Sequence, residues 1–194
     1  MQSITAGALH LPEGESVHFD VCLVALSFTA PDLARVSGLA VDGSDRLEVD
    51  ETLRSITAPT IIGAGDAVVT PPGVGSHLRM GCAVALPLGG HAAETVLHLL
   101  RNQQPKPISI GLILQCLSLG RRRGYIQLVH ADDSPRNLAL NGWLAAAVKE
   151  MVSRMVVTDP RKEREKPGAY RALKGPQAVR LRTRRPHGRR HHGR

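Results

Sequence analysis

The segment 59–67 constrains the fold most, because a short apolar stretch runs there directly into two glycines and an aspartate. It reads Pro59-Thr60-Ile61-Ile62-Gly63-Ala64-Gly65-Asp66-Ala67. Gly63 and Gly65 allow a close backbone approach and positive φ angles, and an ionised Asp66 accepts charge-assisted hydrogen bonds from hydroxyl groups. The backbone amides after such a strand can face a phosphate, particularly where a helix begins. The pattern predicts a turn that binds a phosphorylated polyol, although many α/β proteins contain a glycine-rich turn without a ligand.

The net charge of +8 comes from the C-terminal end of the chain. Residues 161–194 contain 13 Lys and Arg residues and two acidic residues, so the first 160 residues are mildly acidic. The Arg-, Pro-, Gly- and His-rich composition buries too little apolar surface to offset its ordering entropy, and we expect residues 159–194 to form a disordered basic tail. Only 3% of the residues are aromatic, which makes nucleic-acid binding by base stacking a poor expectation.

The cysteines and the N-terminus indicate a cytoplasmic protein. Cys22, Cys82 and Cys116 lie far apart without a C-x-x-C pair, which excludes a paired-cysteine zinc site and a thioredoxin-type redox pair. The segment 1–14 lacks a basic start followed by an apolar run, and no stretch reaches the roughly 18 apolar residues of a spanning helix. We therefore expect neither a secretion signal nor a transmembrane segment.

The hydrophobic pattern of the first half predicts strands and then helices. Residues 17–28 are apolar and β-branched, as in a strand buried on both faces of a parallel sheet. Residues 45–50 alternate polar and apolar, which predicts a half-exposed strand, and residues 60–62 predict a third, very short one. Apolar positions recur at helical spacing over 78–101, but Pro87 and Gly89-Gly90 predict a short helix or turn followed by a longer helix from about 90 to 101.

The second half predicts a hairpin and a closing helix. Residues 108–117 and 124–130 are two strands joined by a basic turn, Arg121 to Arg123. Residues 138–157 form an amphipathic helix. Its apolar stripe consists of Leu140, Trp143, Leu144, Ala147, Val148, Met151 and Met155. We expect this stripe to pack on the domain, the alternative being a membrane surface.

Two longer segments around the glycine turn resemble one family of flavoproteins. Asp50-Glu51-Thr52-Leu53-Arg54-Ser55 followed by the segment 59–67 resembles the second FAD motif of the pyridine-nucleotide flavin oxidoreductases. Residues 79–94 resemble the segment of that family whose backbone amides meet the pyrimidine edge of the flavin. The chain has no C-x-x-C pair, and in this respect it resembles the type II NADH dehydrogenases, which use no redox disulfide. The resemblance covers roughly residues 15 to 157.

This resemblance implies an α/β fold that is the C-terminal part of a flavoprotein with two dinucleotide-binding domains. Residues 1–44 would be a remnant of the nicotinamide-binding domain and 45–104 the returning part of the FAD-binding domain, with 105–158 a small α+β end domain of hairpin and helix. FAD would be the cofactor and NAD(P)H the substrate, with electrons passing to a quinone or another small acceptor. Peripheral contact with the inner face of the cell membrane would fit such relatives.

The resemblance also implies a set of cofactor-binding residues. Asp66 would hold the ribityl chain, and Gly63, Gly65 and Ala67 would form the close turn around it. Leu86, Pro87 and Leu88 would lie at the flavin edge, where a helix N-terminus stabilises negative charge on the reduced ring. No side chain is predicted to act catalytically, and no metal site is expected.

The sequence departs from the family in one respect that bears on activity. The family holds ADP and NAD(P)H with two G-x-G-x-x-G motifs, whereas Gly63 to Val68 supplies the first two glycines of such a motif without the third. We therefore expect a shortened chain that is inactive alone or that associates with another chain supplying the missing half. The alternative is a noncatalytic module whose basic tail engages nucleic acid or anionic membrane.

Three other features have two interpretations each, and a fourth feature has one. His91 is either a proton donor or a capping and packing residue, and Cys82 is either a charge-transfer thiol or a core residue. The basic turn 121–123 is either an anion-steering patch or a solvated turn. His187, His191 and His192 lack the partners of a metal site.

Overall fold

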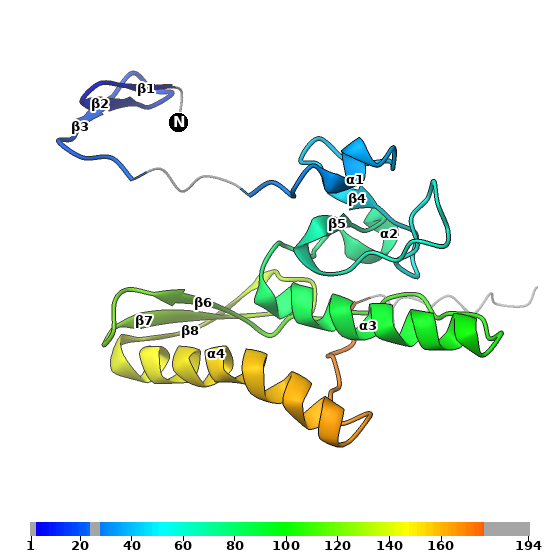
Figure 1. The fold of residues 1–194 in the computed structure, drawn as a ribbon. Coiled ribbons are helices and arrows are strands. Elements are labelled where there is room, and N and C mark those ends of the chain that lie inside the picture. Colours follow the sequence, from blue (N-terminus) through cyan, green and yellow to red (C-terminus); the bar gives the residue numbers. More distant parts are fainter. Residues whose placement is uncertain (1–2, 24–27, 177–194) are drawn as a thin grey trace, which may run out of the picture.

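The computed structural model describes residues 3–23 and 28–176, which contain three small sheets and two long helices (Figure 1). Helices and strands are mixed along the chain, so the predicted α/β class is confirmed at that level. The first sheet pairs β1 (Ser3–Thr5), β2 (Ala8–His10) and β3 (Ser16–His18) in antiparallel order. Figure 1 shows this sheet apart from the elements that follow it.

Of the strand predicted for residues 17–28, only residues 17 and 18 lie in a strand among the residues that the structure describes. β3 ends at His18, and the side chains of Val21 and Leu23 are 87% and 92% exposed. An apolar β-branched run needs neighbouring strands to pair its backbone and cover its faces. The Phe19 N–H still donates to the Gly7 carbonyl at 3.0 Å, but residues 20–23 have no paired strand in the described part of the chain. Residues 24–27 lie outside the described residues.

The central part contains one parallel strand pair beside short helices. The helix α1 (Leu33–Val36) leads to β4 (Leu47–Glu48), which pairs in parallel with β5 (Val68–Val69), and α2 (Pro72–Gly75) follows. Of the half-exposed strand predicted for 45–50, only Leu47 and Glu48 form a strand. The predicted alternation is present, because Leu47 and Val49 are buried on either side of the partly exposed Glu48. The strand predicted for 60–62 is wrong: the backbone turns there, and Ile62 makes only an isolated bridge to Arg54.

The main core is formed where α3 (Cys82–Leu100) packs against the parallel pair and an extended buried segment, 108–112. The buried cluster contains Leu47, Val49, Leu53, Val68, Val74, Val84, Leu88, Ala92, Ile108, Ile110, Leu112 and Val129. The spacing of Val84, Leu88 and Ala92 places them on one helix face. Thr95, the next residue on that face, donates from Oγ1 to the carbonyl of Thr52 at 2.9 Å. The loop 50–54 is thereby attached to α3.

The predicted break in α3 is not found. Pro87, Gly89 and Gly90 all lie within one continuous helix of 19 residues. Pro87 is buried with Leu88, so burial of apolar surface there offsets the hydrogen bond that the proline cannot donate. In the part of the chain that the structure describes, α3 is also the one helix long and apolar enough to cross a membrane, a property that core helices of soluble proteins share.

The C-terminal half forms a three-stranded antiparallel sheet covered by α4 (Gly142–Glu165) (Figure 1). The predicted hairpin is confirmed as β6 (Leu114–Ser118) and β7 (Gly124–Val129), although β6 begins six residues later than expected. β8 (Pro135–Asn141) pairs with β7 and was not predicted. It takes the residues 138–141 that we assigned to the helix, so α4 begins at Gly142.

The disordered tail predicted from residue 159 is wrong as far as residue 176. α4 continues through Pro160 to Glu165, and the chain then turns back to lie beside residues 109–111. The Gly111 N–H donates to the Leu173 carbonyl at 2.7 Å, and Gly175 is buried against the Ile110 backbone. The segment is held by a few backbone contacts rather than by a large buried area of apolar side chains. Its composition therefore suggests disorder although the chain is ordered here. Residues 177–194 lie outside the described residues.

The apolar stripe of α4 does not pack on the domain as predicted. Trp143, Leu144, Met151 and Met155 are 70%, 52%, 56% and 44% exposed, whereas Ala145 is fully buried. A Cβ added to Gly124 would lie 2.8 Å from the Ala146 nitrogen, so β7 approaches the backbone of α4 too closely for large side chains. Small residues form the packed face, Trp143 and Leu144 stay exposed, and Met151 and Met155 line a cavity beside α3.

Candidate functional site

The two glycines of the predicted cofactor turn are required for different reasons. A Cβ on Gly63 would lie 2.4 Å from Cγ1 of Val68 and 3.0 Å from Cδ2 of Leu47, so Gly63 allows the chain to cross the β4–β5 pair closely. Gly65 has a φ of +70°, a left-handed conformation that favours glycine. It begins the 3₁₀ turn η1 (Gly65–Ala67), which carries Asp66 toward α3.

The carboxylate of Asp66 lies at the N-terminus of α3. Its Oδ1 accepts a hydrogen bond from the Gly81 N–H at 2.8 Å, and Gly81 is the N-cap residue of the helix. The Gly81 carbonyl accepts from Val84 and Ala85, whereas the amides of Cys82 and Ala83 have no acceptor among the described residues. A carboxylate and two open amides therefore lie together at the positive end of a long helix dipole.

The predicted site residues divide between two cavities on either side of the first turns of α3. Gly65, Asp66 and Leu88 line a small cavity of about 250 Å³, together with Arg46 and Arg79. Leu86 and Pro87 line a larger one of about 580 Å³. Gly63 and Ala67 line neither, because Gly63 is buried in the turn and Ala67 is exposed.

Both arginines of the small cavity already have carboxylate partners. Arg46 pairs with Asp42 at 2.6 Å, and Arg79 pairs with Asp133 and also donates to the Leu114 carbonyl at 3.1 Å. A phosphate in this cavity would have to compete with these carboxylates. The amides of Cys82 and Ala83 are the remaining donors for an anion. Two amides suit a group with one partial negative charge better than a pyrophosphate.

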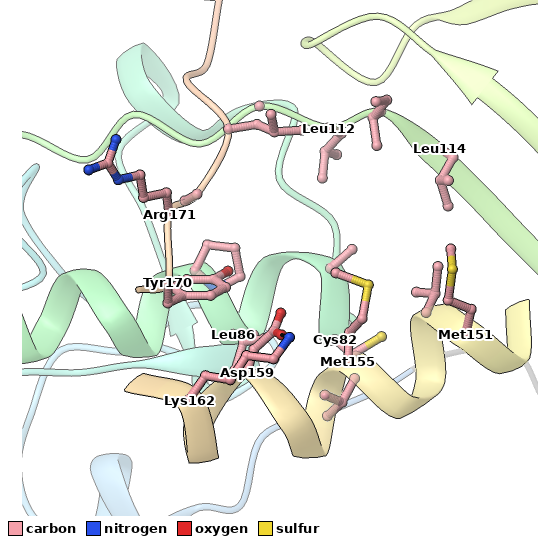
Figure 2. Close-up of a pocket in the computed structure, with 18 of the residues that line it drawn as sticks. Cys82, Leu86, Leu112, Leu114, Met151, Met155, Asp159, Lys162, Tyr170 and Arg171 are labelled. Carbon is pink, nitrogen blue, oxygen red and sulfur yellow. Dashed lines mark ion pairs between the residues drawn. The ribbon is translucent and has the colours of Figure 1, made fainter. Parts of the chain in front are cut away.

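The larger cavity is apolar and collects side chains from four segments (Figure 2). Cys82, Leu86 and Pro87 come from α3, residues 111–114 from the segment that leads into β6, Met151 and Met155 from α4, and residues 169–173 from the returning chain. Its volume lies in the range of small-molecule pockets, roughly 300–1,000 Å³. Asp159 and Lys162 pair with one another at 3.6 Å within its lining, so the cavity presents little uncompensated charge there.

Two ionisable groups beside the larger cavity have shifted pKa values. Burial raises the pKa of Tyr170, and the negative charge of Asp159 raises it further. The N–H groups of Gly168 and Tyr170 donate to the Glu163 carboxylate and lower its pKa. Tyr170 is therefore favoured as the neutral phenol, and Glu163 as the anion.

Sequence reasoning did not identify the contributions of residues 159–173 to this cavity. Their charged composition gave no periodic apolar signal, and only Pro167-Gly168 marked a turn. Cys82 is not the core residue that one of its two interpretations proposed, because it is exposed and lines the cavity. His91 has a packing role: its Nε2 lies 2.9 Å from the Lys106 carbonyl.

The remaining candidate features do not form a site. The turn 121–123 is exposed, as its interpretation as a solvated turn predicts. Among residues 3–23 and 28–176, no group of three or more His, Cys, Asp and Glu side chains is placed to hold a metal ion. The three tail histidines lie outside the described residues.

Comparison with known proteins adds no family assignment. No protein-family model matches the chain, and no curated protein is significantly similar to it. The resemblance to flavin oxidoreductases rests on the quoted motifs alone.

Proposed function

We propose that residues 45–104 are the flavin-contacting part of an FAD-dependent NAD(P)H oxidoreductase of the type II NADH dehydrogenase kind. The observation that carries this proposal is the position of Asp66, whose carboxylate is held 2.8 Å from the N-cap amide of α3. The resembled motif requires a carboxylate after Gly-x-Gly and a helix N-terminus beside it. Both features lie here in one small region.

In this proposal the chain binds and orients the cofactor, and FAD supplies the hydride and electron chemistry. Asp66 Oδ2, which has no partner among the described residues, would accept a hydrogen bond from a ribityl hydroxyl. The amides of Cys82 and Ala83 at the N-terminus of α3 would stabilise negative charge on the pyrimidine edge of the ring. The larger apolar cavity, which begins at Cys82, would admit a quinone or another small apolar electron acceptor.

The ADP half of FAD and the NAD(P)H would need binding residues beyond this chain. The sequence contains no G-x-G-x-x-G, and the two arginines that line the small cavity with Asp66 are paired with carboxylates. We propose that another polypeptide segment supplies both cradles, and that turnover with NADH depends on it.

Flavin titration of the purified chain of 194 residues tests the proposal. FAD should be retained through gel filtration as a yellow chromophore. Asp66→Asn should lower its affinity about tenfold, the usual effect of losing one charge-assisted hydrogen bond. The asparagine keeps an oxygen that can accept from Gly81, so the cap of α3 is preserved. Asp20→Asn, the same change at an exposed position, is the matched control and should have no effect.

Two results would contradict the flavin proposal. One is the absence of any retained flavin on the purified chain. The other is equal FAD affinity in Asp66→Asn and the parent protein, with helix content unchanged by circular dichroism.

The exposed stripe of α4 supports a second function, peripheral contact with a membrane. Trp143 and Leu144 expose apolar side chains on α4, and exposed apolar patches of this kind mark interaction surfaces. A double change of Trp143 and Leu144 to serine should abolish co-sedimentation with phosphatidylcholine–phosphatidylglycerol vesicles. Val21→Ser with Leu23→Ser removes comparable exposed apolar area elsewhere and should leave sedimentation intact. Equal sedimentation of both variants would contradict this proposal.

A further inference from the structure

The chain that follows α4 returns along the protein as an extended strap, residues 166–175. It begins with a turn in which the Lys166 N–H donates to the Lys162 carbonyl at 2.8 Å and the Ala169 N–H to the Lys166 carbonyl at 3.1 Å. Gly168 has a φ of +84°, so this turn depends on a glycine. The turn reverses the chain and directs the strap toward α3.

Both oxygens of the Glu163 carboxylate hold the near end of the strap. Oε1 accepts from the Gly168 N–H at 2.6 Å, and Oε2 accepts from the Tyr170 N–H at 2.7 Å. An acidic residue in the last turn of a helix faces the negative end of the helix dipole, which is unfavourable for the helix alone. Glu163 is therefore explained by the strap and not by the stability of α4.

The far end of the strap is attached to the core segment 108–112. The Leu173 carbonyl accepts from the Gly111 N–H at 2.7 Å, and the Gly175 N–H donates to Ser109 Oγ at 3.1 Å. A Cβ on Gly175 would lie 2.6 Å from the Ile110 carbonyl oxygen. The strap is thus fixed at Gly175 and joined to a hinge-like turn at Gly168.

Between these two ends the strap forms one wall of the larger cavity. Residues 169–173 line it, with the ring of Tyr170 close to α3: a Cβ on Gly90 would lie 3.5 Å from Cδ1 of Tyr170. Figure 2 shows Tyr170 and Arg171 on the strap and Asp159 and Lys162 on the neighbouring helix. Residues 171–174 are exposed, so the strap buries little apolar surface that would keep it closed.

We propose that the strap is a lid over the larger cavity and that the Glu163 carboxylate is the latch that holds it closed. Opening releases the amides of Gly168 and Tyr170 from Glu163 and the Leu173 carbonyl from Gly111, while Gly175 stays in place. The cavity then admits an uncharged apolar molecule from the strap side. The lid depends on the proposed function in one respect, namely that the molecule admitted would be the electron acceptor.

Amide hydrogen exchange in Glu163→Ala, measured by NMR on the flavin-free chain, tests the latch. The Gly168 and Tyr170 amides should exchange about tenfold faster, the effect of losing a hydrogen bond to a charged group. The Gly111 amide should accelerate with them, because its acceptor lies on the strap. Ile126 in β7 should keep its rate. Glu165→Ala removes the same charge from the same helix end without breaking a bond to the strap, and it should change none of these rates.

Uptake of the neutral apolar dye Nile red tests the lid. Its association rate should rise severalfold in Glu163→Ala, less in Glu163→Gln, which keeps one acceptor oxygen, and not at all in Glu165→Ala. An unchanged Gly111 exchange rate or an unchanged dye association rate in Glu163→Ala would overturn the lid. Equal acceleration of the strap and β7 amides would also overturn it, because Glu163 would then stabilise the whole fold.

The lid and the flavin proposal fail independently in these experiments. Both lid measurements are made without FAD, so a chain that retains no flavin still gives a result. Conversely, the effect of Asp66→Asn on FAD affinity does not depend on whether the strap moves.

Discussion

The sequence does not distinguish the roles of the two glycines of the turn. Their surroundings in the structure do. Gly65 adopts a conformation that a side chain disfavours, whereas Gly63 occupies space that a methyl group would share with Val68. The sequence predicted the turn correctly because Gly-x-Gly is a local signal. It could not predict the contact with Val68 and Leu47, which depends on how the turn crosses the strand pair. Cys82 illustrates the same limit, since its helix face became clear only when the packing of α3 was known.

Gly63→Ala should destabilise the fold by about 1–3 kcal/mol, the usual cost of overpacking a core site. Its Cβ would lie 2.4 Å from Cγ1 of Val68, and the buried strand pair has little room to move. The measurement is urea denaturation followed by circular dichroism. Gly43→Ala is the matched control, because a Cβ there has nothing within 4 Å. A Gly63→Ala midpoint equal to that of Gly43→Ala would contradict the packing role.

At the scale of elements, the sequence predicted the types of element better than their limits. The β6–β7 hairpin has strong alternation and a basic turn, and it was found. The break in α3 was wrong because residue propensity gave Pro87 and Gly89 more weight than the burial of Val84, Pro87 and Leu88, which stabilises one continuous helix. β8 was missed because all seven of its residues are exposed, so it lacks the alternation that marks a half-buried strand.

Gly89→Ala should stabilise the protein by about 0.5–1 kcal/mol, because alanine loses less backbone entropy than glycine in a helix interior. The site has space for the change: a Cβ at Gly89 has nothing within 4 Å. The urea midpoint should rise while the slope of the transition stays constant. A lower midpoint would indicate that α3 is interrupted at this position in solution, as the sequence pattern alone suggested.

The Tyr170 phenol on the strap should ionise at a higher pH than an ordinary tyrosine. Burial and the charge of Asp159 raise the pKa of Tyr170, so the folded state favours the neutral phenol. This stabilisation is complete below the usual tyrosine pKa and is lost as the pH rises through the raised value. In Tyr125→Phe, where Tyr170 is the remaining tyrosine, the phenolate absorbance should appear above the usual tyrosine range. Asp159→Asn should lower that midpoint part of the way. A midpoint in the usual range would show that Tyr170 is not buried in solution.

At the scale of the molecule, the two cavities depend on contacts between segments far apart in the chain. The small one combines Arg46, Asp66 and Arg79, and the larger one combines α3, residues 111–114, α4 and the strap. Sequence motifs identified the turn that carries Asp66 because it belongs to one continuous stretch, but they did not identify the start of α3 at Cys82. The strap could not be predicted, since its place depends on backbone hydrogen bonds to Glu163, Gly111 and Ser109 that residue types do not encode.

The arrangement of charge in the whole molecule leads to a prediction about which part of FAD is recognised. Near Asp66 the two arginines are paired with Asp42 and Asp133, and the sequence has no G-x-G-x-x-G to hold a pyrophosphate. The chain should therefore bind flavin through the ribityl chain and the ring alone. Riboflavin, FMN and FAD should bind with dissociation constants within about threefold of one another, a free-energy difference under about 1 kcal/mol.

Fluorescence quenching of the three flavins by the purified chain measures these constants, and Asp66→Asn should weaken all three equally. If FAD binds more than about tenfold tighter than riboflavin, the ADP half has a binding surface on this chain that neither the motifs nor the two cavities reveal. If Asp66→Asn weakens only FAD, the carboxylate does not act on the ribityl chain, because all three flavins share that part.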